Sequence, residues 1–168
     1  MVDDAVDHDR AVGARRALRL KIALDTNVLV YAEDLNGGTR RDIARDLIDR
    51  LLQNHELVVP AQCLGELHRV LVGKVRMPVD SAAGAVLGWA DLARVAATRE
   101  STVKAAFDLV AAHPHQIWDA IILSAAVEAE CVMLLSEDMQ DGFVHRGVTV
   151  VDPFAATPHP LLASLLEP

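Results

Sequence analysis

Aromatic side chains and long apolar runs are both scarce in this sequence. Aromatics make up 4% of the 168 residues, although 52% of the residues are hydrophobic. We therefore expect a core built mainly of Ala, Val, Leu and Ile, a composition that suits helices packed closely on a sheet. No apolar run reaches the roughly 18 residues that a membrane-spanning helix needs, so we expect no membrane protein.

Cysteine is also rare. The sequence has two, Cys63 and Cys131, and they form no CxxC-type pair. We expect both to be reduced core residues of a cytoplasmic protein rather than a disulfide. Residues 1–18 begin acidic and contain no long apolar segment, which argues against a signal peptide. We expect them to form a poorly ordered tail or a loose helix.

Basic residues are outnumbered by acidic ones. The 16 Lys and Arg against 24 Asp and Glu give a formal net charge of −8. Proteins that bind nucleic acid normally present a basic surface, so the charge taken alone argues against such a partner. The objection weakens if many of the acids share one pocket and hold cations there, because the total counts the acids but not their metals.

Apolar segments of strand and helix type alternate along the chain. This alternation predicts a single α/β domain with a central, mostly parallel sheet and helices on both faces. The domain is expected over 19–158, with tails at 1–18 and 159–168. The expected strands are 21–24, 56–60, 94–98, 131–136 and 148–153, and the expected helices are 40–53, 61–74, 80–93, 100–113 and 115–130. In the first of these helices, Thr39 is expected as N-cap and Ile43, Leu47 and Leu51 as the core-facing stripe.

Acidic and polar residues follow two of the predicted strands. Asp25, Thr26 and Asn27 come directly after the strand 21–24, and Ser136 and Asp138 come after Leu135, where the apolar part of the strand 131–136 ends. In folds of this kind, sites lie outside the carboxyl ends of the parallel strands. Two further acids, Glu66 and Asp119, fall on the apolar stripes of predicted helices, where a carboxylate is unusual unless it is paired or binds a metal.

Each acid also has a purely structural interpretation. Asp25 could cap a following helix, Glu66 could pair with Arg69, and Asp119 could stabilise a helix N-terminus. Asp138 and Asp141 could be turn residues before Gly142. A shared site explains with one cause why four chain segments each bring an acid to a strand end or a core edge.

Taken in order, these segments resemble those of PIN-domain ribonucleases, most of all the VapC-type toxins of type II toxin–antitoxin pairs. The matching segments are LDTNVLVY (24–31), ELHRVL (66–71), WDAIILSAA (118–126), LLSEDMQDG (134–142) and VTVVDPF (148–154). The resemblance implies that Asp25, Glu66, Asp119 and Asp138 are catalytic metal ligands. It also implies supporting roles for Thr26, Asn27 and Ser136.

The sequence departs from the family pattern after the fourth acid. Family members often have another acid two positions later, followed by an aromatic residue. Gln140 stands there in this chain, and Asp141-Gly142-Phe143 comes one step later. Asp141 is therefore a doubtful ligand.

The donor chemistry agrees with the resemblance. Clustered carboxylates without a set of His or Cys favour hard cations, Mg²⁺ or Mn²⁺, over zinc. Such an ion could neutralise a phosphodiester and activate a water. We expect His68, two positions from Glu66, to be a surface or packing residue. A phosphatase of the haloacid dehalogenase type would need a second Asp at position 27, where this chain has Asn27.

Three functions remain open from the sequence. The favoured one is a metal-dependent endoribonuclease toxin that acts on RNA and is inhibited by a cognate antitoxin. The others are a housekeeping PIN nuclease in RNA processing and a non-catalytic PIN-like binding module. The resemblance implies a homodimer as well as the antitoxin partner. For these contacts we expect the apolar residues of 43–52 and of the helix that holds Trp89 and Leu92.

Overall fold

Parallel strands form the centre of the computed structural model, which describes residues 19–33 and 38–167. The six strands in these ranges form one sheet in the order β3-β2-β1-β4-β6-β5, and only the β5–β6 pair is antiparallel. The bounds of the strands are β1 Lys21–Leu24, β2 Glu56–Pro60, β3 Arg94–Ala96, β4 Met133–Leu135, β5 Val144–His145 and β6 Val148–Val151. The prediction of a mostly parallel sheet is confirmed. The predicted tail at 1–18 lies outside the described residues.

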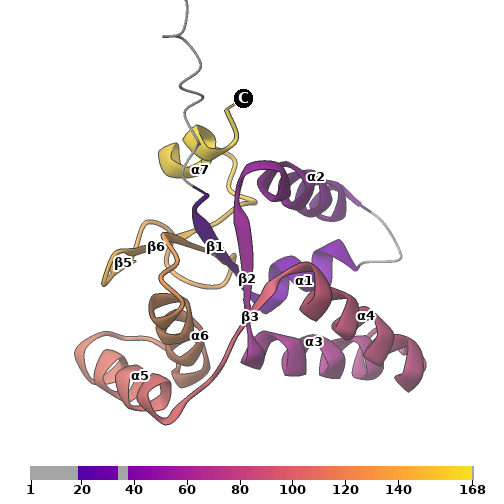
Figure 1. Ribbon diagram of the computed structural model, residues 1–168, viewed down its shortest axis with the longest axis horizontal. Coiled ribbons are helices and arrows are strands. Elements are labelled where there is room, and N and C mark those ends of the chain that lie inside the picture. Colours follow the sequence, from indigo (N-terminus) through magenta and orange to yellow (C-terminus); the bar gives the residue numbers. More distant parts are fainter. Residues whose placement is uncertain (1–18, 34–37, 168) are drawn as a thin grey trace, which may run out of the picture.

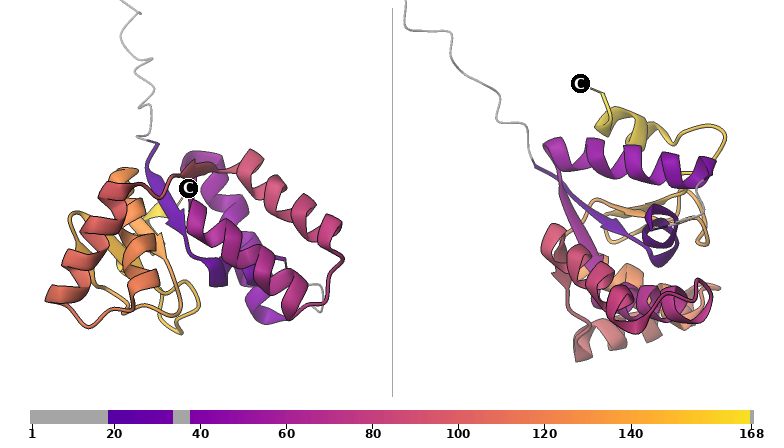
Figure 2. Two further views of the ribbon diagram at one scale, coloured as in Figure 1. Left: turned by 90° about the horizontal axis from the view of Figure 1, so that it is seen from below. Right: turned by 90° about the vertical axis from the view of Figure 1, so that its right-hand side faces the viewer.

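Helices cover both faces of this sheet, as predicted (Figures 1 and 2). In the left view of Figure 2, α1 to α4 lie on one side of the strands, and α5 and α6 lie on the other. The bounds of the helices are α1 Thr26–Ala32, α2 Thr39–Asn54, α3 Ala61–Gly73, α4 Val79–Leu92, α5 Glu100–Ala112, α6 Ile117–Glu128 and α7 Pro160–Leu165. Among the described residues, no helix is long and apolar enough to cross a bilayer.

The core consists mainly of small and aliphatic side chains, as the composition predicts. The strands β1, β2, β4 and β6 are buried almost throughout, because helices or loops cover them. Cys63 and Cys131 are both free and buried within this core, as predicted. Helix α6 is buried over most of its circumference, from Ala120 to Ala126.

Two predictions about α2 need correction. Thr39 is the first residue of α2 rather than its cap, and Gly38 holds the N-cap position with a φ of 125° that favours glycine. The buried stripe of α2 is Ala44, Leu47, Ile48 and Leu51, whereas Ile43 is 38% exposed. A stripe spaced by four residues drifts around a helix with 3.6 residues per turn, so Ile43 is carried out of the core.

Two helices and one strand were not predicted. Helix α1 follows β1 directly, and β5 forms a hairpin with β6 through Arg146 and Gly147, both with positive φ. The segment expected as a C-terminal tail contains α7, whose Leu162 is buried. Arg50 of α2 donates to the Leu166 carbonyl at 2.6 Å, which places this end of the chain beside α2.

The strand order reverses direction between β1 and β4. From β1, the connections through α1–α4 lead to β2 and β3 on one side, and α5 and α6 then lead back to β4 on the other. A crevice opens at such a switch point, outside the carboxyl ends of the two strands. Leu24 pairs with Leu135 in the last register position of these strands, so the residues that follow them emerge side by side.

Candidate active site at the ends of β1 and β4

Asp25 links the end of β1 to the start of α1. Its backbone N–H donates to the Leu135 carbonyl of β4 at 3.0 Å, which continues the sheet by one residue. Its side chain is the N-cap of α1, and Oδ1 accepts from the Thr26 N–H at 2.6 Å. The capping interpretation of Asp25 is therefore confirmed, and it is compatible with a site, because the carboxylate also lines a cleft.

Ser136 follows β4 as Asp25 follows β1. Its Oγ donates to Asp25 Oδ2 at 2.6 Å, and both side chains are buried. The same Oγ accepts from the Met139 N–H at 3.4 Å. A buried carboxylate needs such donors, because an unpaired one costs several kcal/mol. The hydroxyl that the resemblance singled out thus contacts the first acid directly.

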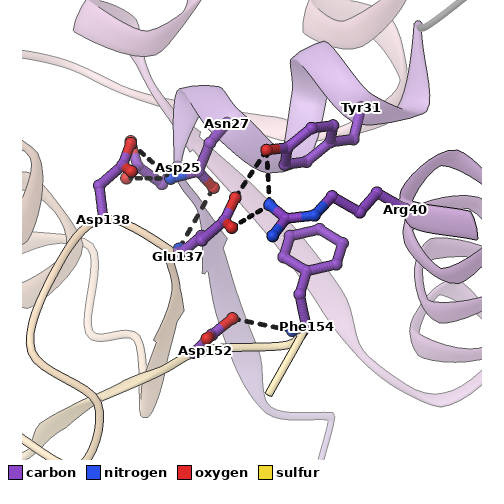
Figure 3. Close-up of polar contacts among 8 residues, drawn as sticks. All are labelled: Asp25, Asn27, Tyr31, Arg40, Glu137, Asp138, Asp152 and Phe154. Atoms are coloured by element: carbon purple, nitrogen blue, oxygen red, sulfur yellow. Dashed lines mark hydrogen bonds and ion pairs between the residues drawn. The ribbon is translucent and has the colours of Figure 1, made fainter. Parts of the chain in front are cut away.

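Asn27 lies between two of the acids (Figure 3). Its Nδ2 donates to Asp25 Oδ2 and to Asp138 Oδ2, both at 3.2 Å. Its Oδ1 accepts from the Glu137 N–H at 3.4 Å, which fixes which end of the amide faces the acids. The amide therefore holds the loop after β4 against the first turn of α1.

Glu66 comes from α3, on the other side of α1. Its Oε2 accepts from Thr26 Oγ1 at 2.8 Å, and its Oε1 accepts from Gln62 Nε2 at 2.9 Å. The structure records no ion pair between Glu66 and Arg69, so that alternative is wrong. The hydroxyl of Thr26 instead points the carboxylate towards the ends of the strands.

Asp119 lies in the first turn of α6 and is half-buried. A carboxylate there is favoured by the dipole of the helix, as the structural interpretation expected. The side chain also lines the same cleft as the other acids. Both interpretations of Asp119 therefore hold together.

The four predicted acids line one cleft of about 290 Å³. The residues around it are Asp25, Thr26, Asn27, Val30, Tyr31, Glu66, Val70, Lys74, Asp119, Ile122 and Asp138. Thr26 and Asn27 thus line the cleft too, whereas Ser136 supports Asp25 from within the core. Asp141 is absent from this lining, and its Oδ1 instead accepts from the Asp152 N–H at 2.9 Å. His68 is partly exposed and does not line the cleft either.

The electrostatics of the cleft are those of crowded acids. The pKa of Asp25 is raised to about 6, mainly by burial and also by the charges of Asp119 and Asp138, although hydrogen bonds from Ser136 and Thr26 lower it. Burial also raises the pKa of Asp119, and the neighbouring Asp138 and Glu66 add to that rise. Such shifts mark a place where a cation would be stabilised.

A divalent ion fits this donor set as a hydrated ion. Among the described residues, no three His, Cys, Asp or Glu side chains are grouped closely enough to hold a metal directly. Mg²⁺ usually keeps several waters and takes only one or two carboxylates, so it does not need a complete protein cage. Asp25 and Asp138 accept from the same Asn27 amide nitrogen, so these two carboxylates lie close to each other.

The sequence analysis missed a second group of polar residues beside the cleft (Figure 3). Tyr31 donates from its hydroxyl to Glu137 Oε2 at 2.7 Å, and Arg40 of α2 forms an ion pair with the same carboxylate. The Arg40 guanidinium lies over the rings of Tyr31 and Phe154. One feature of the sequence could have indicated this group: Asn27 and Tyr31 lie four residues apart, and this spacing places them on one face of α1.

The match of a sequence-family model decides the family. The model of the PIN domain matches residues 22–143, most of the chain. The chain belongs to the PIN domain family. No protein with curated annotation matches it.

Solved structures of a toxin and of toxin–antitoxin complexes share the fold of this chain. Mycobacterium tuberculosis VapC20, described as a toxin that cleaves the sarcin–ricin loop, is 16% identical, with a TM-score of 0.57 over 70% of this chain and 89% of that one. The DNA-bound VapBC of Salmonella typhimurium is 14% identical, with a TM-score of 0.60 over 80% and 98%. A toxin–antitoxin complex from Klebsiella pneumoniae is 20% identical, with a TM-score of 0.58 over 79% and 98%.

Proposed function

We propose that this PIN domain is a Mg²⁺- or Mn²⁺-dependent endoribonuclease and the toxin of a type II toxin–antitoxin pair. The observation that carries the proposal is the meeting of Asp25, Glu66, Asp119 and Asp138 in one cleft. These acids come from four separate segments, and their mutual repulsion contributes to the raised pKa values of Asp25 and Asp119, an arrangement that destabilises the fold unless a cation uses it. The likeness to VapC and VapBC structures supports the toxin assignment.

In the proposed reaction the chain's own residues arrange the acids. The bound ion would supply charge neutralisation for the phosphodiester and an activated water. Asp25 and Asp138 would hold it, with Glu66 and Asp119 in reach through water. Ser136 and the Thr26 N–H keep the Asp25 carboxylate charged, because both hydrogen bonds lower its pKa. Thr26 Oγ1 keeps Glu66 turned towards the cleft.

A positive side chain also reaches the cleft. Lys74, the C-cap residue of α3, is the one cationic residue among the described side chains that line it. Opposite the acids, it is suited to contact the phosphate of the RNA strand next to the scissile bond. Its exposed position makes this contact sensitive to salt.

The proposal includes an antitoxin and a second copy of the chain as partners, both in the cytoplasm. The surfaces expected for these contacts need revision. Trp89 is buried and donates to Glu33 Oε1 at 2.9 Å, and most apolar residues of 43–52 are core residues. The exposed apolar residues of α4 are Val79, Leu87 and Leu92, which are 60%, 63% and 49% exposed. We therefore assign the antitoxin contact to α4.

RNA cleavage with and without metal tests this proposal. The purified protein is expected to cut RNA in Mg²⁺ or Mn²⁺, to stop in EDTA, and to stop when a cognate antitoxin is added. Cleavage that no antitoxin inhibits would favour a housekeeping nuclease. A protein that binds the antitoxin, but cleaves RNA in no metal even when the antitoxin is absent, would favour a binding module instead.

A further inference from the structure

Three histidines and a phenylalanine gather at one end of the acidic cleft. His113 and His115 lie on the connection between α5 and α6, and His145 ends β5. Phe143 lies among them, with ring centroids 5.3 Å from His113, 4.6 Å from His115 and 6.4 Å from His145. The sequence analysis had found no set of histidines, because these residues come from two segments about 30 positions apart.

The ring cluster has a cavity of its own that opens beside the acids. Its volume is about 200 Å³, and Asp119 and Asp138 belong to its wall as well as to that of the acidic cleft. The remaining wall includes Phe143, His113 and His115, together with the amides of Gln116 and Gln140. A ligand in this cavity would thus lie directly beside the acids of the proposed active site.

The rings are open to solvent in part. Phe143, His115 and His145 are only partly buried, and His113 is exposed. Phe143 follows Gly142, whose φ of 77° favours glycine, and its carbonyl accepts from the Val150 N–H of β6 at 2.8 Å. The three histidines are not a metal site, since no group of three such side chains with that geometry exists among the described residues.

Flat phenyl and imidazole rings suit one class of ligand. Unpaired nucleobases stack on Phe and His side chains, and their edges accept and donate hydrogen bonds to amides such as those of Gln116 and Gln140. Burial lowers the pKa of His145, and Arg146 lowers it further, so this ring is neutral at neutral pH. Stacking needs no basic surface, which suits a chain whose formal net charge is −8.

We propose that the ring cluster is a subsite for one unpaired nucleobase of the RNA strand, next to the phosphate held at the acids. This inference rests on the proposed ribonuclease function. The base would stack on Phe143 and contact the His113 and His115 rings, which lie at 73° and 64° to the Phe143 ring, with its edge towards Gln116 and Gln140. The subsite would place the strand by a contact that salt does not weaken.

RNA binding measured apart from cleavage tests the subsite. The probe is a short fluorescein-labelled single-stranded RNA, with its affinity followed by anisotropy in EDTA at several salt concentrations. Phe143→Leu should weaken binding roughly 5- to 100-fold, the range for the loss of one stacked base. Phe143→Tyr should bind like the wild type. The dependence of the affinity on salt should stay unchanged in both, because no phosphate contact is lost.

An abasic nucleotide supplies the second half of the test. Moved along the probe, it should weaken wild-type binding at one position only and cause no further loss in Phe143→Leu. His113→Ala, at an exposed ring, should reproduce part of the loss if Phe143→Leu proves unstable. Phe107→Leu is the matched control, because Phe107 is a 59% exposed phenylalanine of α5 that does not belong to the ring cluster.

The outcomes separate this proposal from the nuclease proposal. Base-dependent binding that requires Phe143, in a protein that never cleaves RNA with metal, would leave the subsite standing and overturn the nuclease. Metal-dependent cleavage together with unchanged binding by Phe143→Leu and His113→Ala would overturn the subsite alone. A wild type that binds no RNA, or that shows equal losses at every abasic position, would also overturn the subsite.

Discussion

The hydroxyl of Ser136 donates to Oδ2 of Asp25 at 2.6 Å, across the boundary between β4 and β1. Both side chains are buried, so the Ser136 hydroxyl supplies a hydrogen bond to the carboxylate that bulk water cannot supply. It also lowers the pKa of Asp25 against the stronger effect of burial, and the net pKa is about 6. Ser136 is therefore a positioning residue that keeps Asp25 charged.

Ser136→Ala should shift the pH profile of RNA cleavage to higher pH. Without the hydroxyl, the pKa of Asp25 rises, so the charged form needed for the metal is reached later. We expect a loss of about 10–100-fold at neutral pH, the range for residues that support metal ligands. Ser136→Thr keeps the hydroxyl and should restore most of the activity. A uniform loss with an unshifted profile would contradict this role.

Glu137 and Asp138 are adjacent acids with opposite predicted effects. Glu137 is held by Tyr31 and Arg40 and turned away from the cleft, whereas Asp138 lines it. Glu137→Gln should therefore retain most metal-dependent cleavage, and Asp138→Asn should lose about 10–100-fold or more. Cleavage rates over a range of Mg²⁺ concentrations compare the two. Equal losses of cleavage in Glu137→Gln and Asp138→Asn would contradict the assignment of the metal to Asp138 rather than Glu137.

The stability of the metal-free protein should increase as the pH falls from neutral to about 5. The pKa of Asp25 is raised from 3.8 to about 6 in the folded state, and that of Asp119 is raised as well. Between the two pKa values of Asp25, the folded state binds more protons than the unfolded state, so acidification favours folding. For Asp25 the full effect is on the order of 2–3 kcal/mol, at 1.36 kcal/mol per pKa unit, and about half of it is present by pH 5.

Chemical denaturation in EDTA at a series of pH values measures this effect. Other carboxylates with a lowered pKa, such as Glu128, act in the opposite direction and below this range. Asp25→Asn removes the titrating group and should flatten the curve between about pH 4 and pH 6. A wild-type protein that loses stability steadily over the same interval would contradict the assignment of a raised pKa.

The sheet and the four acids could be predicted from the sequence because both depend on a clear pattern of apolar segments. Apolar strands alternating with helices allow few topologies, and each acid stands out against an apolar segment such as that around Asp119. The short elements were missed because they lack such a contrast: α1 merges with the apolar run after Asp25, and β5 has only two residues. Ile43 was misplaced because a four-residue spacing approximates the period of a helix only locally.

Contacts between distant segments could not be read from the sequence. The approach of Arg40 to Glu137 depends on how α2 packs beside α1, and the ring cluster depends on the turn at Gly142. Both involve side chains that form no periodic pattern. Asp25 also shows that a structural and a functional interpretation of one residue do not exclude each other, since it caps α1 and lines the cleft.

The central claim is that Asp25 stands at the end of β1 to hold a metal ion for RNA cleavage. Asp25→Asn keeps the shape of the side chain and removes its charge, and Asn is also a good N-cap, so a purely structural role would survive the change. The decisive measurement is the rate of Mg²⁺- or Mn²⁺-dependent RNA cleavage by this variant, together with its melting temperature without metal. The account predicts a loss of at least about 10–100-fold at an equal or higher melting temperature. Cleavage close to the wild-type rate would contradict it.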